Sequence, residues 1–320
     1  MTPAGGRRLT WVVGGGGLLG QAVRAELSRR GASLFEPPPV PWSSPERSSA
    51  ALVRASAELA TEARRAGIGW RILWCAGSGV TGTAQERLDA EVRAFSALLD
   101  AMAEHTDVPG SLFMASSAGG VYAGAPEPPF TEAHPVAPIS AYGWAKLAQE
   151  EAARRFSQLS GVPTVVGRIA NLYGPGQDLS KAQGLVSHVC RSYLTGQPVS
   201  IYVPLDTVRD YLYVDDAAAI VVDSLMRAEA AGPGSMTVKI IASQQGTTVG
   251  ALLGDCHRVL KRMPRVVLGS SPNARLQARD LRLRSTVWRE LDQRALTPLP
   301  AGLHATCTGL LRSIQRGTRT

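Results

Sequence analysis

The 320-residue sequence predicts an α/β fold: a doubly wound parallel sheet followed by a smaller C-terminal portion. Two observations lead to this prediction. Short apolar segments alternate with amphipathic ones through the first half of the chain, and Gly or Ser closely follows most apolar segments. A glycine cluster also follows the first apolar segment directly, which in such sheets is the position of a nucleotide site.

The apolar residues 9–13 predict the first strand, and the spacing of apolar residues in 18–30 predicts a helix that ends before Gly31. Residues 34–35 begin a second strand that the prolines at 37–39 interrupt, and residues 40–42 predict a brief third strand. Further helices are expected at 49–66, 86–104 and 142–159, and further strands at 71–75, 112–115 and 164–169.

The alternation becomes irregular after Tyr173. We therefore expect residues 1–174 to form the nucleotide-binding domain and residues 175–320 to be mainly a substrate-binding portion. A segment of about 208–228 resembles a strand end and a helix, and is expected to return to the first domain.

The composition excludes several classes of protein. With 44% hydrophobic residues and no glycine period, the chain is neither disordered nor collagen-like. Its apolar runs are too short to span a bilayer, which predicts a soluble, cytoplasmic protein without a membrane partner. The four cysteines have no CxxC spacing, so neither a metal site nor a disulfide framework is expected, and all four are predicted to be small buried hydrophobic residues.

Positive charge is concentrated at one end of the sequence. The formal net charge is +8, and residues 257–320 hold thirteen Arg or Lys against three Asp or Glu. Such a bias suits nucleic acid or a smaller anionic ligand. Because no aromatic interleaving or nucleic-acid motif accompanies it, we expect no nucleic-acid partner.

The glycine cluster satisfies two dinucleotide-binding spacings at once, Gly15-x-Gly17-x-x-Gly20 and Gly14-x-x-Gly17-x-x-Gly20. In both registers the glycines permit a tight turn and a close approach of the backbone to a pyrophosphate. The amides at the start of the following helix then face the anion. The cluster predicts a bound dinucleotide.

Tyr142 and Lys146 are four residues apart in a predicted helix, so both side chains lie on one face. A nearby ammonium group stabilises phenolate, which is expected to lower the pKa of Tyr142 towards neutrality. Such a tyrosine can move a proton to or from a substrate hydroxyl while hydride moves to or from a nicotinamide. Ser116 and Ser117, which close a preceding strand, are expected nearby.

With these motifs the chain resembles the extended short-chain dehydrogenase/reductases, in particular the NAD-dependent epimerase/dehydratase family that modifies nucleotide sugars. The resemblance extends over nearly the whole chain and implies a Rossmann fold. It rests on residues 13–20, 75–77, 116–117 before 121–122, 142–146, 168–176, 209–216 and 296–303.

The resemblance implies roles for individual residues. Tyr142 would be the acid/base catalyst, Lys146 would tune it and hold the nicotinamide ribose, and Ser117 would hydrogen-bond the reacting sugar oxygen. The NAD or NADP cofactor would contact Tyr142 and Lys146 together with Gly14, Gly17, Leu18, Leu19, Gly20, Ala76, Gly77 and Ile169. The nucleoside-diphosphate sugar would contact Ser116, which is the alternative to Ser117, as well as Asn171, Arg209 and Arg275.

Departures from the family pattern bear on the cofactor and the reaction. Pro38 occupies the place where NAD-preferring relatives carry Asp, which leaves NADP possible, although Glu36 would fill that role if the second strand ends early. Residues 117–120 lack the Thr-Asp-Glu that dehydratases carry, which argues against a 4,6-dehydratase.

Two reactions at C4 of the sugar remain open, namely a 4-epimerase and a 4-ketoreductase. The alternatives are a reductase or dehydrogenase for a non-nucleotide substrate, and a catalytically silent cofactor-binding protein. The resemblance also implies a homodimer formed through the helices at 86–104 and 142–159. A monomer in light scattering would contradict that expectation.

Overall fold

The computed structural model describes residues 7–180, 183–262, 264–271 and 276–316. Its main feature is a six-stranded sheet whose neighbouring strands are all parallel. In spatial order the strands are β2 (Ser33–Leu34), β1 (Arg8–Val13), β3 (Gly69–Trp74), β4 (Gly110–Ser117), β5 (Thr164–Ile169) and β9 (Met236–Ile241). The predicted α/β fold with a doubly wound parallel sheet is confirmed.

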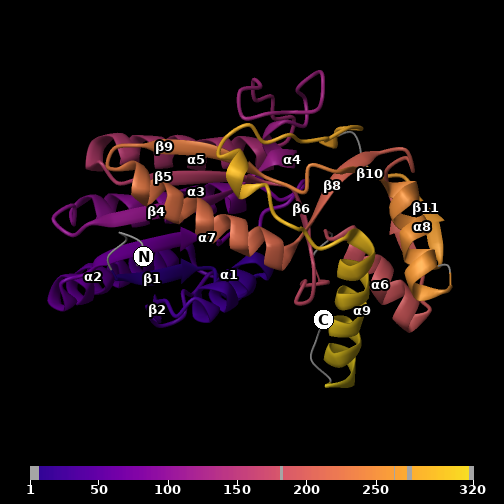
Figure 1. Ribbon diagram of the computed structural model, residues 1–320, viewed down its shortest axis with the longest axis horizontal. Coiled ribbons are helices and arrows are strands. Elements are labelled where there is room, and N and C mark those ends of the chain that lie inside the picture. Colours follow the sequence, from indigo (N-terminus) through magenta and orange to yellow (C-terminus); the bar gives the residue numbers. More distant parts are fainter. Residues whose placement is uncertain (1–6, 181–182, 263, 272–275, 317–320) are drawn as a thin grey trace.

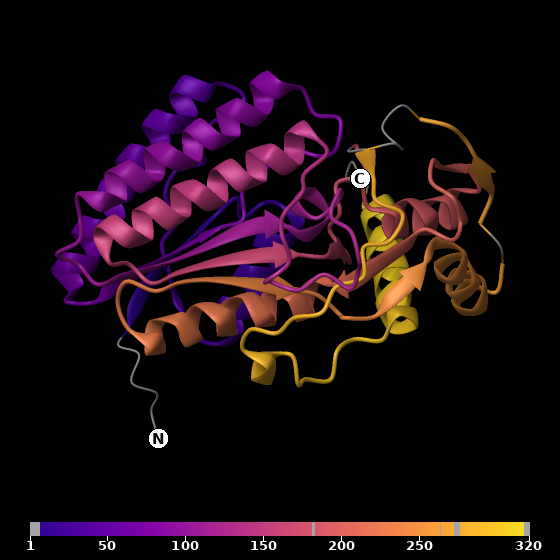
Figure 2. The ribbon, with the colours of Figure 1, turned by 90° about the horizontal axis from the view of Figure 1, so that it is seen from above.

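Helices cover both faces of this sheet (Figure 1). On one face α2 (Pro45–Ala66), α3 (Gln85–Ala103) and α5 (Ala141–Ser160) lie side by side, as Figure 2 shows. On the other face α1 (Leu18–Arg29) packs against α7 (Val214–Ala231). Each interface buries its own hydrophobic core, and the interior strand β5 contributes to both because every one of its residues is buried.

The smaller part of the molecule lies beyond the carboxyl ends of the main strands (Figures 1 and 2). Its described residues form two small sheets and three α-helices around a separate core. Its strands are β6 (Asn171–Tyr173), β7 (Val199–Ile201), β8 (Val208–Tyr213), β10 (Gly246–Thr248) and β11 (Val266–Leu268). Its helices are α6 (Leu185–Thr195), α8 (Val249–Leu260) and α9 (Leu299–Gln315).

Local sequence signals explain where the two long helices on the first face begin and end. Pro45 occupies the first turn of α2, where a missing N–H costs nothing, and Gly67 ends it in the left-handed conformation at φ 63°. The hydroxyl of Ser140 accepts a hydrogen bond from the Gly143 amide at 3.2 Å and so caps α5, which ends at Gly161.

The predicted third strand at residues 40–42 is wrong. Residues 35–44 form no strand, because the prolines at 37–39 and Pro41 cannot donate to a neighbouring strand. The Trp42 amide instead turns back to the carbonyl oxygen of Val40 at 3.0 Å. Strand β9, at the edge of the main sheet, had no counterpart in the sequence analysis.

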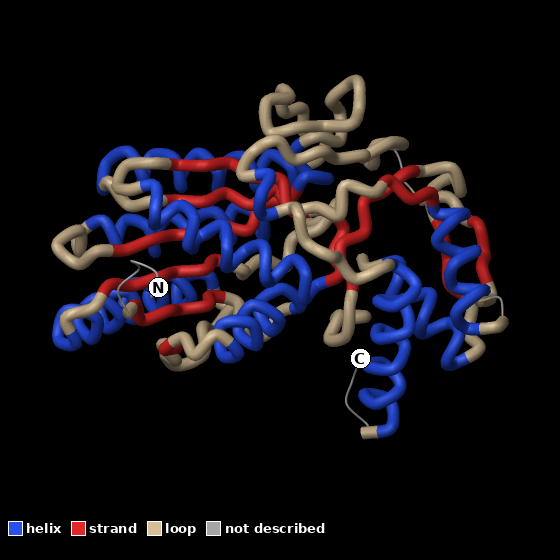
Figure 3. Tube along the Cα trace, viewed as in Figure 1, coloured by secondary structure: helices blue, strands red, loops and turns tan. Residues whose placement is uncertain are grey.

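The C-terminal residues 276–298, which we call the strap, run from the smaller part back to the edge of the main sheet. They are mostly loop (Figure 3), apart from the short helix η2 (Arg289–Leu291). Backbone hydrogen bonds of 2.8 Å join Phe130 to Arg282 and to Arg284 and hold the middle of the strap in place.

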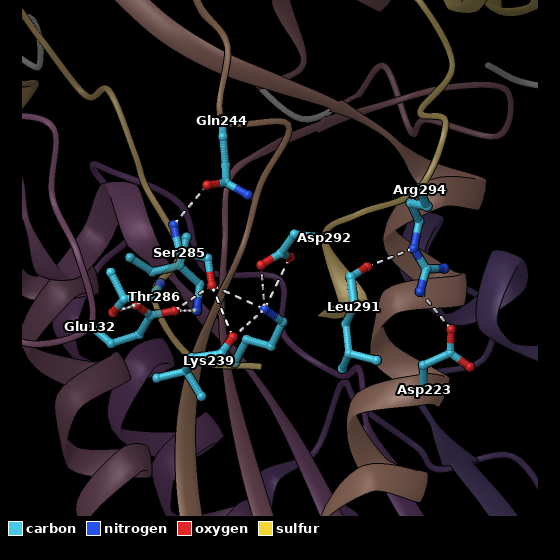
Figure 4. Close-up of polar contacts among 11 residues, drawn as sticks. Glu132, Asp223, Lys239, Gln244, Ser285, Thr286, Leu291, Asp292 and Arg294 are labelled. Atoms are coloured by element: carbon cyan, nitrogen blue, oxygen red, sulfur yellow. Dashed lines mark hydrogen bonds and ion pairs between the residues drawn. The ribbon is translucent and has the colours of Figure 1, made fainter. Parts of the chain in front are cut away.

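A group of buried polar side chains, the polar clamp, fixes the end of the strap to β9 (Figure 4). Lys239 has no exposed surface, and its Nζ donates to both carboxylate oxygens of Asp292 at 3.0 Å and to Ser285 Oγ at 3.0 Å. It also donates to the carbonyl oxygen of Val287 at 2.8 Å. A buried ammonium group requires this complete set of acceptors.

Glu132 forms the second half of the clamp (Figure 4). Its carboxylate accepts hydrogen bonds from the amides of Ile240 at 2.9 Å and Thr286 at 2.8 Å, and from Ser285 Oγ at 2.7 Å. Burial alone would raise the pKa of Glu132, but these donors outweigh it and lower the pKa below its usual value. The clamp thereby joins three segments that are distant in the sequence.

The cysteines and the basic C-terminal region can also be compared with their predictions. All four cysteines are free; Cys190, Cys256 and Cys307 are buried as predicted, whereas Cys75 is only partly buried. Several C-terminal arginines form ion pairs, including Arg279 with Asp206 and Arg294 with Asp223.

None of the helices in the described part of the chain is both long and apolar enough to cross a lipid bilayer.

Candidate active site

A cavity of about 1670 Å³ lies where the main strands end, between the sheet and the smaller part. The strand ends meet there because Val13 pairs with Trp74, and Ser117 with Ile169, across neighbouring strands. The predicted site residues that line the cavity are Gly14, Gly17, Leu18, Leu19, Ala76, Gly77, Ser116, Ser117, Tyr142, Lys146, Ile169, Asn171 and Arg209. Arg275 lies outside the described residues.

The glycine cluster forms a tight loop between β1 and α1. Gly14 has φ 83°, and a methyl group there would lie 2.5 Å from the backbone of Ala76. The Gly17 amide closes the turn by donating to the carbonyl oxygen of Gly14 at 3.0 Å. A methyl group at Gly20, which does not line the cavity, would lie 2.2 Å from that same oxygen.

These contacts favour the register Gly14-x-x-Gly17-x-x-Gly20, in which the first glycine makes the turn and the last lets α1 pack against it. Leu18 and Leu19, the first residues of α1, line the cavity, so a pyrophosphate there would meet the unpaired amides of a helix N-terminus. The loop therefore fits a dinucleotide.

An ion pair between Arg24 and Glu36 lies beside the glycine loop. Strand β2 ends at Leu34, so Glu36 is the acidic residue that follows it. Arg24, on α1, binds both carboxylate oxygens of Glu36, at 2.8 and 2.7 Å. The Arg24 side chain also lies over the glycine loop, since a methyl group at Gly15 would be 2.7 Å from its Cδ. The early strand end is the condition on which the sequence analysis expected Glu36, rather than Pro38, to meet an adenosine ribose, although Glu36 is not among the residues that line the cavity.

Tyr142 and Lys146 lie one turn apart on α5, next to the end of β4. The Lys146 Nζ is 6.0 Å from the centre of the Tyr142 ring, and it donates to the carbonyl oxygen of Ala115 at 3.2 Å and to Gln149 Oε1 at 3.0 Å. Ser117 hydrogen-bonds the phenol of Tyr142 and accepts from the Gly120 amide at 3.1 Å. A phenol, a hydroxyl and an ammonium group thus share one wall of the cavity.

The expected lowering of the pKa of Tyr142 is not what the structure gives. Burial raises this pKa above its usual value; the hydrogen bond from Ser117 opposes the rise, and the carboxylate of Glu91 adds to it. Burial also lowers the pKa of Lys146, against the opposing effect of Glu91 and Glu150. In this state Tyr142 is protonated at neutral pH and is suited to donate a proton.

Ser116 and Ser117 have different environments. The Ser116 hydroxyl is buried and donates to Glu150 Oε1 at 2.5 Å. Glu150 in turn pairs with Arg168 at 2.7 Å, and the Arg168 guanidinium donates to the Tyr122 hydroxyl at 2.7 Å. Because Ser116 belongs to this buried network, Ser117 is the better placed of the two to meet a substrate oxygen.

Asn171 and Arg209 also line the cavity. Asn171 is exposed at the start of β6, and Arg209 is largely buried on β8. The Arg209 guanidinium donates to the carbonyl oxygen of Val208 at 2.8 Å and to Gln277 Oε1, on the strap, at 3.3 Å. Burial lowers the pKa of Arg209, although an arginine remains charged in such a site. This arrangement suits an anionic group of a ligand.

Comparison with known proteins agrees with this geometry. The profile of the NAD dependent epimerase/dehydratase family matches residues 10–238, which is well over half of the chain. The chain belongs to this family. The family is NAD-dependent, in agreement with the nicotinamide cofactor expected from the glycine cluster and the Tyr-Lys pair.

Curated relatives of this chain include both epimerases and dehydratases. A putative UDP-glucose 4-epimerase of Methanocaldococcus jannaschii is 34% identical over 107 residues, which are 33% of this chain and 35% of that protein. A dTDP-glucose 4,6-dehydratase of Salmonella typhimurium is 37% identical over 91 residues, 28% of this chain and 24% of that protein. The matches thus span about a third or less of these relatives' lengths.

The solved structure of UDP-glucose 4-epimerase from Thermus thermophilus, in complex with NAD, has the same fold over nearly its whole length. It superposes with a TM-score of 0.78 at 22% identity, covering 95% of this chain and 99% of that one.

Several cavity residues of this family member were not predicted from the sequence. Glu91 on α3, Gln277 on the strap and Trp42 after β2 all line the cavity. None of them belongs to a short motif. Each lies in the site because the fold brings it next to residues that are distant in the sequence. Arg24, which positions Glu36, was also missed, although its location on the helix after the glycine cluster was a usable signal.

Proposed function

We propose that the protein is an NAD-dependent enzyme acting at C4 of a nucleoside-diphosphate sugar, most simply as a 4-epimerase. The observation that carries this proposal is the composition of one cavity. It is lined by a dinucleotide-binding glycine loop, by Tyr142, Ser117 and Lys146, and by Asn171 and Arg209.

Each group has a distinct task in this proposal. NAD, held by the glycine loop, would supply a reversible hydride acceptor for C4 of the sugar. In its phenolate form Tyr142 removes the proton from the C4 hydroxyl, and as a phenol it later gives that proton back, while Ser117 donates a hydrogen bond to the same oxygen. Lys146 holds the nicotinamide ribose, and Asn171 and Arg209 bind the diphosphate.

We further propose that residues 1–174, with the returning segment of about 208–228, bind the cofactor, and that the substrate is held mainly by 175–320. The homodimer expected through α3 and α5 is proposed as well, because Trp144 on α5 leaves 61% of its surface exposed.

Two local features favour epimerisation over the other reactions. Ala118 and Gly119 follow Ser117, so the positions directly after this serine hold no carboxyl pair for eliminating water. Glu36, held by Arg24, suits a ribose with a free 2′-hydroxyl and therefore NAD. An enzyme that returns the hydride within one catalytic cycle has no need of the NADPH pool.

The test combines cofactor content with turnover. We expect the purified, denatured protein to release near-stoichiometric NAD, identified by mass spectrometry. We also expect the intact enzyme to interconvert C4 epimers of UDP- or dTDP-hexoses without added cofactor. An empty site that prefers NADPH, with turnover of a 4-keto sugar, would identify a ketoreductase. Turnover of neither, with no thermal protection by nucleoside diphosphates, would exclude nucleotide sugars.

The role of Glu36 leads to a separate prediction. Glu36→Gln removes the negative charge that binds the ribose hydroxyls and releases Arg24, which is then free to meet a 2′-phosphate. We expect the preference for NAD over NADP to fall by roughly 10–100-fold, the value of a hydrogen bond to a charged group. Calorimetric titration of the protein with each nucleotide measures this ratio.

Glu62→Gln, an identical change at an exposed position of α2, is the control and should leave the ratio unchanged. A Glu36→Gln protein that keeps the wild-type preference would assign cofactor choice to other residues.

A further inference from the structure

Glu91 lies on α3 and lines the cavity, and its first carboxylate oxygen is fully engaged. Oε1 accepts hydrogen bonds from the Ser78 amide at 2.7 Å, the Ser78 hydroxyl at 3.0 Å and the Gly79 amide at 2.9 Å. The segment that follows β3, which lines the cofactor end of the cavity, is therefore held by one carboxylate.

The second oxygen lies beside the catalytic pair. A methyl group at Gly77 would be 3.5 Å from Glu91 Oε2 and 3.6 Å from Lys146 Nζ, so both atoms border the same glycine. A methyl group at Gly79 would be 3.4 Å from Glu91 Oε2 and 3.3 Å from Cδ2 of Tyr142. Glu91 Oε2 thus borders one glycine together with Lys146 and another together with Tyr142.

The backbone of Glu91 is tied to the same residues. Its carbonyl oxygen accepts from Gln149 Nε2 at 3.5 Å, and Gln149 Oε1 accepts from Lys146 Nζ at 3.0 Å. Gln149 thus connects the backbone of α3 at Glu91 to the lysine of α5.

We propose that Glu91 is a positioning residue with two tasks. It anchors the Ser78–Gly79 wall of the cofactor site, and its negative charge keeps the Tyr142–Lys146 pair protonated, which sets the pH at which Tyr142 becomes a base. This inference rests on the proposed function only for the identity of the substrate.

The charges around the pair determine the sign of the effect. Lys146 is faced by Glu91 from α3, by Glu150 from its own helix and by the thiol of Cys75 after β3. Tyr142 is faced by Ser117 from β4, by Lys146, and by Glu91. A carboxylate beside a phenol disfavours phenolate, so removing the charge of Glu91 must lower the pKa of Tyr142.

The experiment uses the NAD-loaded enzyme and measures ionisation of Tyr142 directly. The tyrosinate absorbance of each protein is titrated against pH, and the same titration of its Tyr142→Phe counterpart is subtracted. Glu91→Gln keeps an oxygen acceptor for Ser78 and Gly79 but removes the charge. We expect the midpoint of Tyr142 to fall by roughly one pH unit. The acid limb of the pH–rate profile for hydroxyl oxidation should shift by the same amount.

Two variants separate charge from other effects. Glu91→Asp keeps the charge and should leave the midpoint close to that of the wild type, even where the shorter side chain weakens NAD binding. Asp100→Asn, which removes an exposed charge elsewhere on α3, should not move it.

An unchanged midpoint in Glu91→Gln, or an equal shift in Asp100→Asn, would overturn the inference. A shifted midpoint in a protein that turns over no nucleotide sugar would support the role of Glu91 and reject the proposed substrate. Turnover of nucleotide sugars with no shift in the midpoint would support the proposed substrate and reject the role of Glu91.

Discussion

Tyr142→Phe is expected to reduce kcat on the nucleotide sugar by roughly 10²–10⁴-fold, the usual contribution of a positioned acid/base group. The hydroxyl is the only part of the side chain that changes, and it hydrogen-bonds Ser117 inside the cavity. Because phenylalanine keeps the ring, binding of NAD and of the nucleoside diphosphate should change little. Steady-state kinetics and calorimetric binding, measured on one preparation, separate the two quantities.

Tyr193→Phe is the matched control. Tyr193 lies on α6, outside the cavity, and its ring packs against the Arg262 guanidinium. This variant should keep wild-type turnover. If Tyr142→Phe retained full turnover, another group would have to be the acid/base catalyst, and a catalytically silent cofactor-binding protein would become the better description.

Lys239→Met should destabilise the fold more than any other substitution considered for this chain. It leaves the carboxylate of Asp292, whose side chain is 9% exposed, without its counter-charge, and the carbonyl oxygen of Val287 without a donor. Removing one partner of a buried ion pair costs about 3–5 kcal/mol in the free energy of unfolding. In a chain of this size that lowers Tm by on the order of 10 °C. Differential scanning calorimetry and urea unfolding measure the change.

The control and a compensating variant make this prediction specific to the pair. Lys261→Met removes an exposed lysine after α8 and should change stability by less than about 0.5 kcal/mol. The double variant Lys239→Met with Asp292→Leu buries no unpaired charge and should recover a large part of the loss. Equal melting of the Lys239 and Lys261 variants would mean that the polar clamp contributes nothing to stability.

Most of the main sheet could be predicted from the sequence because its central strands are short apolar runs with glycine or serine close behind. Strand β5 matches its predicted range, residues 164–169, and α5 differs from its prediction by one residue at each end. Strand β9 could not be predicted in this way. Lys239 lies in its middle, and a lysine in an apolar run looks like a solvated residue until Asp292 is seen beside it.

The candidate site likewise contains some residues that could be predicted from the sequence and others that could not. The glycine loop and the Tyr142–Lys146 pair depend on spacings of a few residues, which a sequence displays directly. Glu91, Gln277 and Arg24 reach their partners across distances that only the folded chain establishes. The predicted direction of the pKa shift of Tyr142 was wrong for a related reason. The sequence displays the lysine but not the burial and the opposing carboxylate, which together outweigh it.

The position of β9 has a consequence for how the protein is made. Its neighbour β5 ends at Ile169, but β9 begins only at Met236, after most of the smaller part. At about 5–20 residues per second, a ribosome needs several seconds to synthesise the residues between them. During that time a nascent chain carries β5, a strand that is buried along its whole length in the finished fold, as an open edge available for wrong pairing. Lys239 gains its counter-charge only after Asp292 has been synthesised. The edge of the sheet is therefore fully protected only when the strap has left the ribosome.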